Sequence, residues 1–174
     1  LYAHREYDPL QEQSFVPAFA HRLDRNTEGL MIAGKSAQAL RSLYTLFQTH
    51  ALDKRYLALV QGHMDQKQGD IRLYYQKDHQ RNHTRLYEAY AEGRTLVHSA
   101  YQIKERFAHC DLVEVILHTG KSHQIRASLA FLGHPLLGDR KYQGIDSWQK
   151  PYQALCAYQL QFPQEDLGCL QHLA

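Results

Sequence analysis

The sequence predicts an α+β fold, and three observations support this prediction. Short β-rich segments recur along the chain, two stretches have the apolar spacing of helices, and two neighbouring β-rich segments fit an antiparallel hairpin. The chain has 174 residues, of which 44% are hydrophobic. This composition is enough for one full core, so we expect residues 1–174 to form one compact domain.

The first half of the chain contains two predicted strands and one predicted helix. Residues 1–20 show no sustained period and are expected to form a loop or an extended arm. Residues 30–33 are apolar and bounded by glycines, which predicts a buried strand. Ser36 can cap a helix over residues 37–49. Residues 53–62 begin polar and become apolar in a β-like run, which predicts a second strand.

The second half begins with a polar, basic segment, residues 66–92, which we expect to be mobile or to face a partner. Residues 95–104 and 112–118 are the two arms of the predicted hairpin. Ser122 can cap a second helix, which Gly133 is placed to end. After a turn-rich link, a last β-rich segment precedes a proline, and this pattern predicts a late strand over residues 155–162.

The composition excludes several classes of protein. Lys and Arg total 20 against 18 Asp and Glu, so the net charge of +2 is far from that of a polybasic binder. The 3 cysteines are too scattered for a disulfide framework or a zinc knuckle, which favours a reducing, cytoplasmic compartment. No stretch approaches the ~20 apolar residues needed to cross a bilayer, so we expect no membrane association. The 12 His and 12 Tyr suit a surface that handles bases or sugars, although most tyrosines are expected at half-buried strand positions.

Asp24 is the clearest candidate for a catalytic residue. It stands between Arg22 and Arg25, and these permanently charged guanidinium groups favour its ionised form. An ionised carboxylate is available as a nucleophile or as a hydrogen-bond acceptor. A structural ion pair that braces a loop is the alternative interpretation, and the spacing alone does not exclude it.

Other candidate sites fail on spacing or remain ambiguous. Residues 120–122 (GKS) look like the end of a phosphate-binding loop, but Val115 stands where that motif needs its second glycine. The histidines lack the spacing of a zinc enzyme, so we expect no metal site. Taken singly, Tyr56 is explained as an ordinary strand tyrosine and Arg126 as a charge on a helix surface.

Five stretches together resemble pseudouridine synthases of the RluA type, because they occur in the same order and at approximately the same spacing. The stretches are 21–30 (HRLDRNTEGL), 54–60 (KRYLALV), 117–126 (LHTGKSHQIR), 133–142 (GHPLLGDRKY) and 155–162 (LCAYQLQF). The resemblance implies a mixed, largely antiparallel sheet with flanking helices and a central RNA-binding cleft. The implied activity is isomerisation of uridine to pseudouridine, in 23S ribosomal RNA, by a monomer that needs no metal, nucleotide or organic cofactor.

The resemblance also implies roles for single residues. Asp24 would be the nucleophile that adds to the ribose C1′ or to uracil, and Arg126 would pair with it and keep it ionised. Tyr56 would stack on the base and take part in proton removal. These three residues form the predicted catalytic set.

The predicted RNA-binding residues are Arg22, Lys121 and His123. Arg22 would fill the gap that the extruded nucleotide leaves in its stack. Lys121 replaces a usual arginine, and lysine cannot make a bidentate phosphate contact. Glu28 occupies a place where serine is frequent in the family. The family's usual first strand and the S4 domain of many members are not found before these motifs, so we expect an N-terminally incomplete catalytic domain.

Two functions of other kinds stay open at this point. A catalytically silent RNA-binding module would bind RNA in a salt-sensitive way but form no pseudouridine. A hydrolase that uses Asp24 with Glu28 is less favoured, because two carboxylates on one loop rarely reach the opposed geometry of a glycosidase. Within the family, transfer RNA is the alternative to ribosomal RNA as the substrate.

Overall fold

The computed structural model describes residues 15–81, 83–145, 152–164 and 170, and these residues fall into two compact units. The described part of the first unit consists of residues 15–22, 31–52, 161–164 and 170, and the second unit takes the remainder. No helix within these described ranges is long and apolar enough to cross a membrane.

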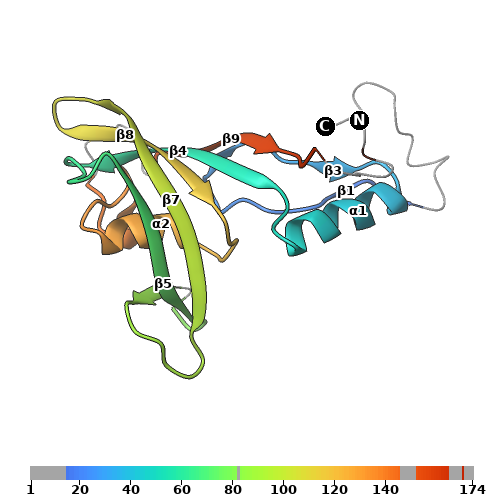
Figure 1. Cartoon of the computed structure of the whole chain (residues 1–174), viewed down its shortest axis with the longest axis horizontal. Helices are drawn as coiled ribbons and strands as arrows, with labels where there is room; N and C mark the ends of the chain where they lie inside the picture. The colour runs from blue at the N-terminus through green and yellow to red at the C-terminus, as the bar shows by residue number, and fades with distance from the viewer. Residues whose placement is uncertain (1–14, 82, 146–151, 165–169, 171–174) are drawn as a thin grey trace. The chain divides into compact units, whose positions relative to one another are not determined.

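The first unit is built from one helix and a two-stranded sheet (Figure 1). Strands β1 (Ala18–Phe19) and β3 (Ala33–Gly34) pair antiparallel, and α1 spans Ala37–Gln48. Ser36 caps α1, because its Oγ accepts a hydrogen bond of 3.2 Å from the backbone N–H of Ala39. The predicted helix over residues 37–49 and its capping residue are therefore confirmed.

The second unit contains a mixed, largely antiparallel sheet, as predicted. Its strands follow the order β2-β9-β4-β8-β7-β5-β6, in which β2 pairs parallel with β9 and the pairs β4–β8, β8–β7, β7–β5 and β5–β6 are antiparallel. The strands are β2 (Glu28–Gly29), β4 (Asp53–Gln61), β5 (Gln68–Asp78), β6 (His83–Tyr87), β7 (Thr95–Arg106), β8 (Cys110–Leu117) and β9 (Leu155–Gln161). The predicted hairpin is β7–β8, and the predicted strands over residues 53–62 and 155–162 are β4 and β9.

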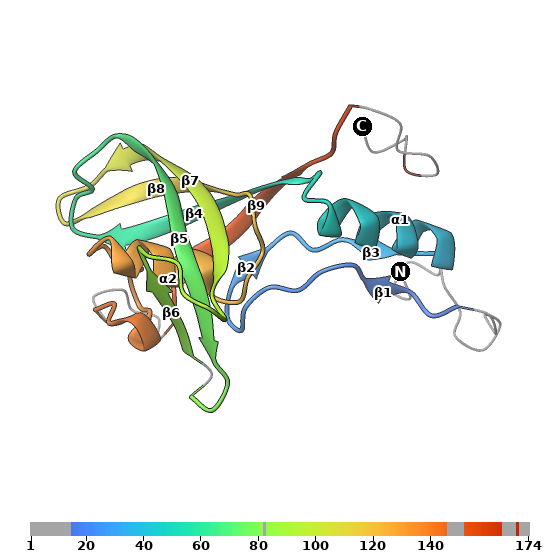
Figure 2. The ribbon, with the colours of Figure 1, turned by 60° about the horizontal axis from the view of Figure 1, so that its bottom comes forward.

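One face of this sheet is covered by α2 (Gln124–Phe131), which lies against it in Figure 2. Burial alternates along β4, so that every second side chain from Lys54 to Val60 is buried. Three of them, Tyr56, Ala58 and Val60, pack with residues of β8 and with Ile125 and Leu129 of α2 into the main core of the unit. The face toward α2, called the inner face below, therefore carries the core.

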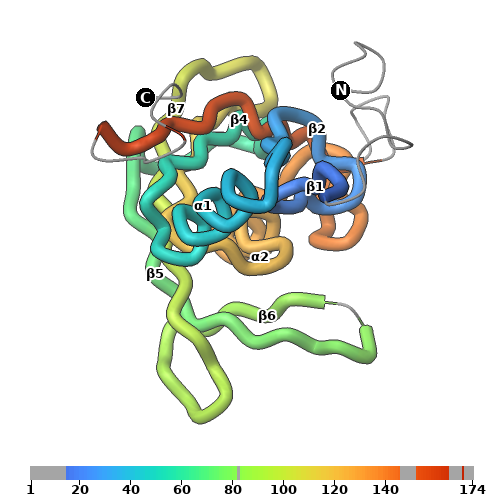
Figure 3. Tube along the Cα trace, turned by 90° about the vertical axis from the view of Figure 1, so that its right-hand side faces the viewer, coloured from blue at the N-terminus to red at the C-terminus, as the bar shows by residue number. Residues whose placement is uncertain are grey.

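Residues 66–92, which are expected to be mobile or to face a partner, hold regular secondary structure in their described part. They form β5 and β6, and Figure 3 shows the two strands running together as a hairpin. Only alternate positions such as Ile71, Leu73 and Leu86 are buried. A strand that buries only one face needs apolar residues only at alternate positions, so its overall composition can be mostly polar. For this reason the composition of residues 66–92 did not indicate the two strands.

Two expectations are wrong. Residues 30–33 do not form one buried strand, because residues 30–32 lie between β2 and β3, Ala33 alone pairs as the first residue of β3, and Leu30 is 49% exposed. Ser122 does not cap α2, since the N-cap residue is His123, in a left-handed conformation with φ of 56°. Gly133, with φ of 87°, follows the end of α2 as expected.

Candidate active site

Asp24 lies at the start of a tight turn in the second unit. The backbone N–H of Thr27 donates to the carbonyl of Asp24 at 2.9 Å, and Asn26 takes a left-handed conformation with φ of 66°. Asparagine adopts this conformation more readily than most residues. The buried Gln153 donates its Nε2 to the carbonyl of Arg25 at 2.7 Å and to the hydroxyl of Thr27 at 3.1 Å. The turn is thus bound to the segment that leads into β9.

Gly29 brings the end of this turn against β9. A Cβ atom at Gly29 would lie 2.1 Å from the carbonyl oxygen of Ala157, and the φ of 125° is one that side chains rarely allow. The N–H of Leu30 donates to the same carbonyl at 2.8 Å. Glycine is therefore required for the parallel pairing that supports the Asp24 loop.

Arg126 on α2 connects two carboxylates. Its Nε and Nη2 donate to the two oxygens of Asp139 at 2.6 and 2.8 Å, in a bidentate pair whose members are both buried. Its Nη1 lies 3.6 Å from Oδ2 of Asp24, which is longer than a hydrogen bond. The guanidinium thus compensates the charge of Asp24 without a close contact to its oxygen, and the Asp24 side chain stays 20% exposed.

Asp139 is held by the segment that follows α2. It is 1% exposed and also accepts a hydrogen bond of 3.2 Å from the N–H of Lys141, at the start of the short 3-10 helix η2 (Arg140–Tyr142). Burial opposes the charge of Arg126, but the carboxylates of Asp139 and Asp24 outweigh this effect and raise the pKa of the guanidinium. The ring of Tyr142 lies beneath the guanidinium, with its centroid 5.3 Å from Cζ.

Tyr56 lies on the inner face of β4 and is 9% exposed. Its core cluster includes Leu23, the neighbour of Asp24 in sequence. Burial first, and then the negative charge of Asp24, raise the pKa of the Tyr56 phenol to about 12. The phenol is therefore protonated at neutral pH.

His123 contacts Tyr142 at the start of α2. The Tyr142 hydroxyl accepts a hydrogen bond of 3.1 Å from the N–H of Thr84 and lies 3.0 Å from Nδ1 of His123. Burial lowers the pKa of His123 to about 4, although the nearby Asp24 acts in the opposite direction. The imidazole is thus neutral at neutral pH, and the arrangement fits a Tyr142 hydroxyl that donates to an unprotonated Nδ1.

Gln124 holds the loop before α2 against β7. Its Oε1 accepts from the hydroxyl of Thr119 at 2.9 Å and from the N–H of Lys121 at 3.1 Å. Its Nε2 donates to the carbonyl of His98 at 3.0 Å and to the hydroxyl of Ser99 at 2.8 Å. All the polar positions of this buried amide are used, so the loop has a defined path.

The structure brings most of the predicted site residues together. Asp24 is paired with Arg126, and its charge acts on the pKa values of both Tyr56 and His123. Lys121 is exposed on the loop before α2. Arg22 is exposed and belongs to the first unit, so the structure does not test its predicted place beside the RNA.

Sequence analysis missed the residues that hold this site in place, namely Asp139, Tyr142, Gln124 and Gln153. Asp139 and Tyr142 lie in the stretch over residues 133–142 that resembles the family, but the resemblance did not indicate a role for either of them. Each of these residues has at least one contact to a segment 13 or more residues away in the chain, and no local pattern predicts such contacts. Within the described residues, the side chains that could hold a metal ion are Asp70, His98 and His118.

Comparison with known proteins shows which family this chain resembles. Residues 1–131 match the family model described as RNA pseudouridylate synthase. An uncharacterized RNA pseudouridine synthase of Mycoplasma genitalium is 34% identical over 167 residues, which cover 92% of this chain and 51% of the relative. Ribosomal large subunit pseudouridine synthase C of Escherichia coli is 33% identical over 122 residues, which cover 70% of this chain and 38% of the relative. The chain thus spans about half the length of the first of these relatives, and less of the second.

Solved structures agree with the sequence comparisons. Human RNA pseudouridylate synthase domain containing 1 superposes with a TM-score of 0.75 at 25% identity, over 85% of this chain and 64% of the human chain. Human RNA pseudouridylate synthase domain containing 4 gives a TM-score of 0.71 at 24% identity, over 84% of this chain and 67% of that one, and supports the fold. The motifs, the fold and the matched family model together show that this chain belongs to the RNA pseudouridylate synthase family.

Proposed function

We propose that this chain isomerises uridine to pseudouridine in RNA, with Asp24 as the nucleophile. The observation that carries the proposal is the pairing of a partly exposed Asp24 with Arg126, whose other side is fixed by Asp139. The carboxylate adds to the ribose C1′ or to uracil, and the bond from C1′ to N1 breaks. The base then turns, C5 bonds to C1′, the proton on C5 is lost, N1 gains a proton, and the carboxylate leaves. No atom is gained or lost overall.

Tyr56 and Arg126 have distinct tasks in this proposal. Arg126 places its positive charge beside the carboxylate of Asp24, with Nη1 3.6 Å from Oδ2, and balances the negative charge of the attacking group. Tyr56 provides a ring for the base to stack on. Because its phenol has a raised pKa of about 12, Tyr56 can take part in proton removal only by passing its own proton on as it accepts another, and not as a resting phenolate.

Arg22, Lys121 and His123 are proposed to contact the RNA. Lys121 is exposed where the loop before α2 is held by Gln124, so its ammonium can reach a phosphate. His123 is neutral at neutral pH and would contribute a hydrogen bond or a stacking face rather than a charge. The proposed substrate is 23S ribosomal RNA, because curated relatives are named as ribosomal large subunit pseudouridine synthases.

The proposal is tested by mapping pseudouridine in the ribosomal and transfer RNA of a strain that lacks the intact protein. We expect a specific 23S position to lose its pseudouridine and to regain it when the wild-type gene is restored. Loss of a transfer RNA position instead would change the substrate but keep the activity. If no position is lost, the isomerase function is wrong.

Restoration with the Asp24→Asn variant tests the nucleophile. This change keeps the size of the side chain but removes the attacking carboxylate, so we expect no pseudouridine at the target position and nearly unchanged RNA binding. Glu28→Gln, at the start of β2 directly after the Asp24 turn, is the matched control and should restore the modification fully, because Glu28 has no role in the proposed reaction. Modification that persists with Asp24→Asn would contradict the mechanism.

A silent RNA-binding module remains the second candidate, and the same experiment separates it from the enzyme. Such a module would bind RNA less tightly as salt is raised, yet the modification map would not change on deletion. A restored modification with wild type but not with Asp24→Asn rules it out.

A further inference from the structure

A group of potential metal ligands lies on the face of the sheet that points away from α2. His98 stands between Val97 and Ser99 on β7, and both of these neighbours are buried. Ser99 bonds to Gln124 of α2, so the alternation of the strand turns His98 to the opposite, outer face. Asp70 precedes the buried Ile71 on β5 and is on the same outer face.

His118 completes the group directly after β8, the third strand involved. It directly follows Leu117, the buried last residue of β8, and lies across from His98. The N–H of His98 donates to the hydroxyl of Thr119 at 2.9 Å, and the N–H of Thr119 donates to the carbonyl of His98 at 3.2 Å. Two backbone contacts therefore keep the two histidines side by side.

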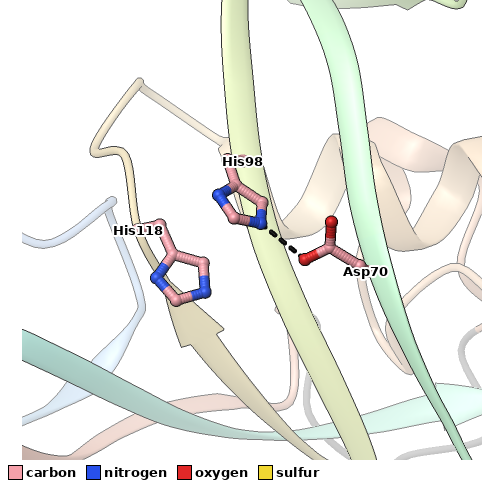
Figure 4. A group of neighbouring side chains, drawn as sticks. All are labelled: Asp70, His98 and His118. Atoms are coloured by element: carbon pink, nitrogen blue, oxygen red, sulfur yellow. Dashed lines mark hydrogen bonds and ion pairs between the residues drawn. The ribbon is translucent and has the colours of Figure 1, made fainter.

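The side chains of this group are close together, as Figure 4 shows. The rings of His98 and His118 stack with their centroids 4.2 Å apart, and Nε2 of His98 lies 2.5 Å from Oδ1 of Asp70. One ligand atom from each residue lies within 4.8 Å of the other two. Ligands at ~2.0–2.2 Å around a tetrahedral ion stand ~3.4 Å apart, so small side-chain rotations would close the group around an ion.

The charges of the group also fit a cation. The second oxygen of Asp70 is 2.8 Å from Nε of Arg72, so Arg72 can orient the carboxylate while Oδ1 faces the ion. Asp70 is 50% exposed, which leaves solvent access for a further ligand.

We propose that Asp70, His98 and His118 form a binding site for a divalent transition-metal ion of the zinc class. Two imidazole nitrogens and one carboxylate oxygen are ligands that Zn²⁺ accepts in tetrahedral sites, with water in the fourth position. The ion would connect β5, β7 and β8 on the outer face. Its binding is independent of the Asp24 chemistry, because the two sets of side chains point to opposite faces of the sheet.

The test is a calorimetric titration of the untagged, chelator-treated intact protein with ZnCl₂, together with the absorption spectrum of the Co²⁺ form. We expect saturable binding of one ion per chain, visible Co²⁺ bands, and a rise in thermal unfolding temperature. His118→Ala and Asp70→Asn should each weaken binding at least about tenfold. His109→Ala removes an exposed histidine on the β7–β8 turn and should leave binding unchanged.

His118→Ala keeps the pair between Asp70 and His98, so its circular dichroism spectrum should match that of the wild type, and this comparison separates lost binding from lost folding. Binding that survives in both ligand variants, or absence of saturable binding by the folded wild type, would overturn the proposal. Neither result would affect the pseudouridine map, so the two proposals fail separately.

Discussion

Arg126 interacts with two carboxylates, and the distances show that it binds one of them more closely than the other. It holds Asp139 by two hydrogen bonds of 2.6 and 2.8 Å, while Asp24 is 3.6 Å away and more exposed. Asp139 is therefore the residue that positions the guanidinium, and Asp24 is left available for chemistry.

This inequality predicts different stability costs for the two aspartates. Asp139→Asn leaves the buried Arg126 without its bidentate partner and should lower the free energy of unfolding by about 3 kcal/mol. Asp24→Asn should cost less than about 1 kcal/mol, because the pair is longer and partly exposed. Urea denaturation followed by circular dichroism measures both, and equal losses would refute the ranking.

The lowered pKa of His123 predicts that this residue contributes to acid stability. Its pKa in the folded protein is about 4, below the ordinary value of 6.5, so the unfolded chain binds the proton more readily between these two values. The contribution of His123 to the free energy of unfolding is therefore fully present above pH 6.5 and is lost as the pH falls toward 4. Asparagine tolerates the left-handed backbone of this position, so His123→Asn is a suitable test. Between pH 7 and pH 5, the free energy of unfolding of this variant should fall by about 1–2 kcal/mol less than that of the wild type. Urea titrations at both pH values test this, and an identical pH dependence in the two proteins would show the contribution to be absent.

At the scale of elements, the parallel pair β2–β9 determines where the Asp24 loop ends. Gly29→Ala would place a methyl group on the carbonyl of Ala157 in a backbone conformation that alanine disfavours. We expect a loss of about 1–3 kcal/mol in the free energy of unfolding, together with a strong loss of pseudouridine formation, because the loop must move.

Gly93→Ala is the matched control for this change. Gly93 also has a positive φ, of 80°, but no atom lies within 4 Å of the added Cβ position. The loss in free energy of unfolding caused by Gly93→Ala therefore measures only the effect of the backbone conformation, and pseudouridine formation should be retained. If Gly29→Ala costs no more than Gly93→Ala and keeps activity, the close approach to β9 is not what positions the loop.

The elements with a clear local pattern were predictable from sequence. Ser36 and the apolar spacing after it gave α1, and the β-rich runs gave β4, β7, β8 and β9. The strands β5 and β6 were missed, because a strand with one buried face can be mostly polar. The pairing of Asp24 with Arg126 followed from resemblance, whereas the support from Asp139 depends on packing between α2 and η2, which no spacing encodes.

At the scale of the whole molecule, the two units have cores of different size. The described core of the first unit has Ala20, Leu43 and Leu170 as its buried members, whereas the main core of the second joins β4, β8, β9 and α2. A region with few buried apolar residues opens at a lower free-energy cost.

We therefore expect amide hydrogen exchange in α1 to be at least about tenfold faster than in β4 and β8. Mass spectrometry of peptides from the intact protein measures this difference. Leu43→Ala should speed exchange in α1 and leave β4 unchanged, and Val113→Ala should do the reverse. Equal acceleration of all three elements by either variant would show that the chain opens as a single cooperative unit.

The attachment of the Asp24 turn to Gln153 and Ala157 also has a consequence for biosynthesis. The contact between Gln153 and Arg25 spans 128 residues, so the ribosome makes Asp24, the proposed nucleophile, long before it makes the support. A nascent chain carries the carboxylate but cannot yet place it, because β2 has its parallel partner only after β9 has been synthesised. Competence to modify RNA is thus expected to arise late in translation, when β9 joins the sheet.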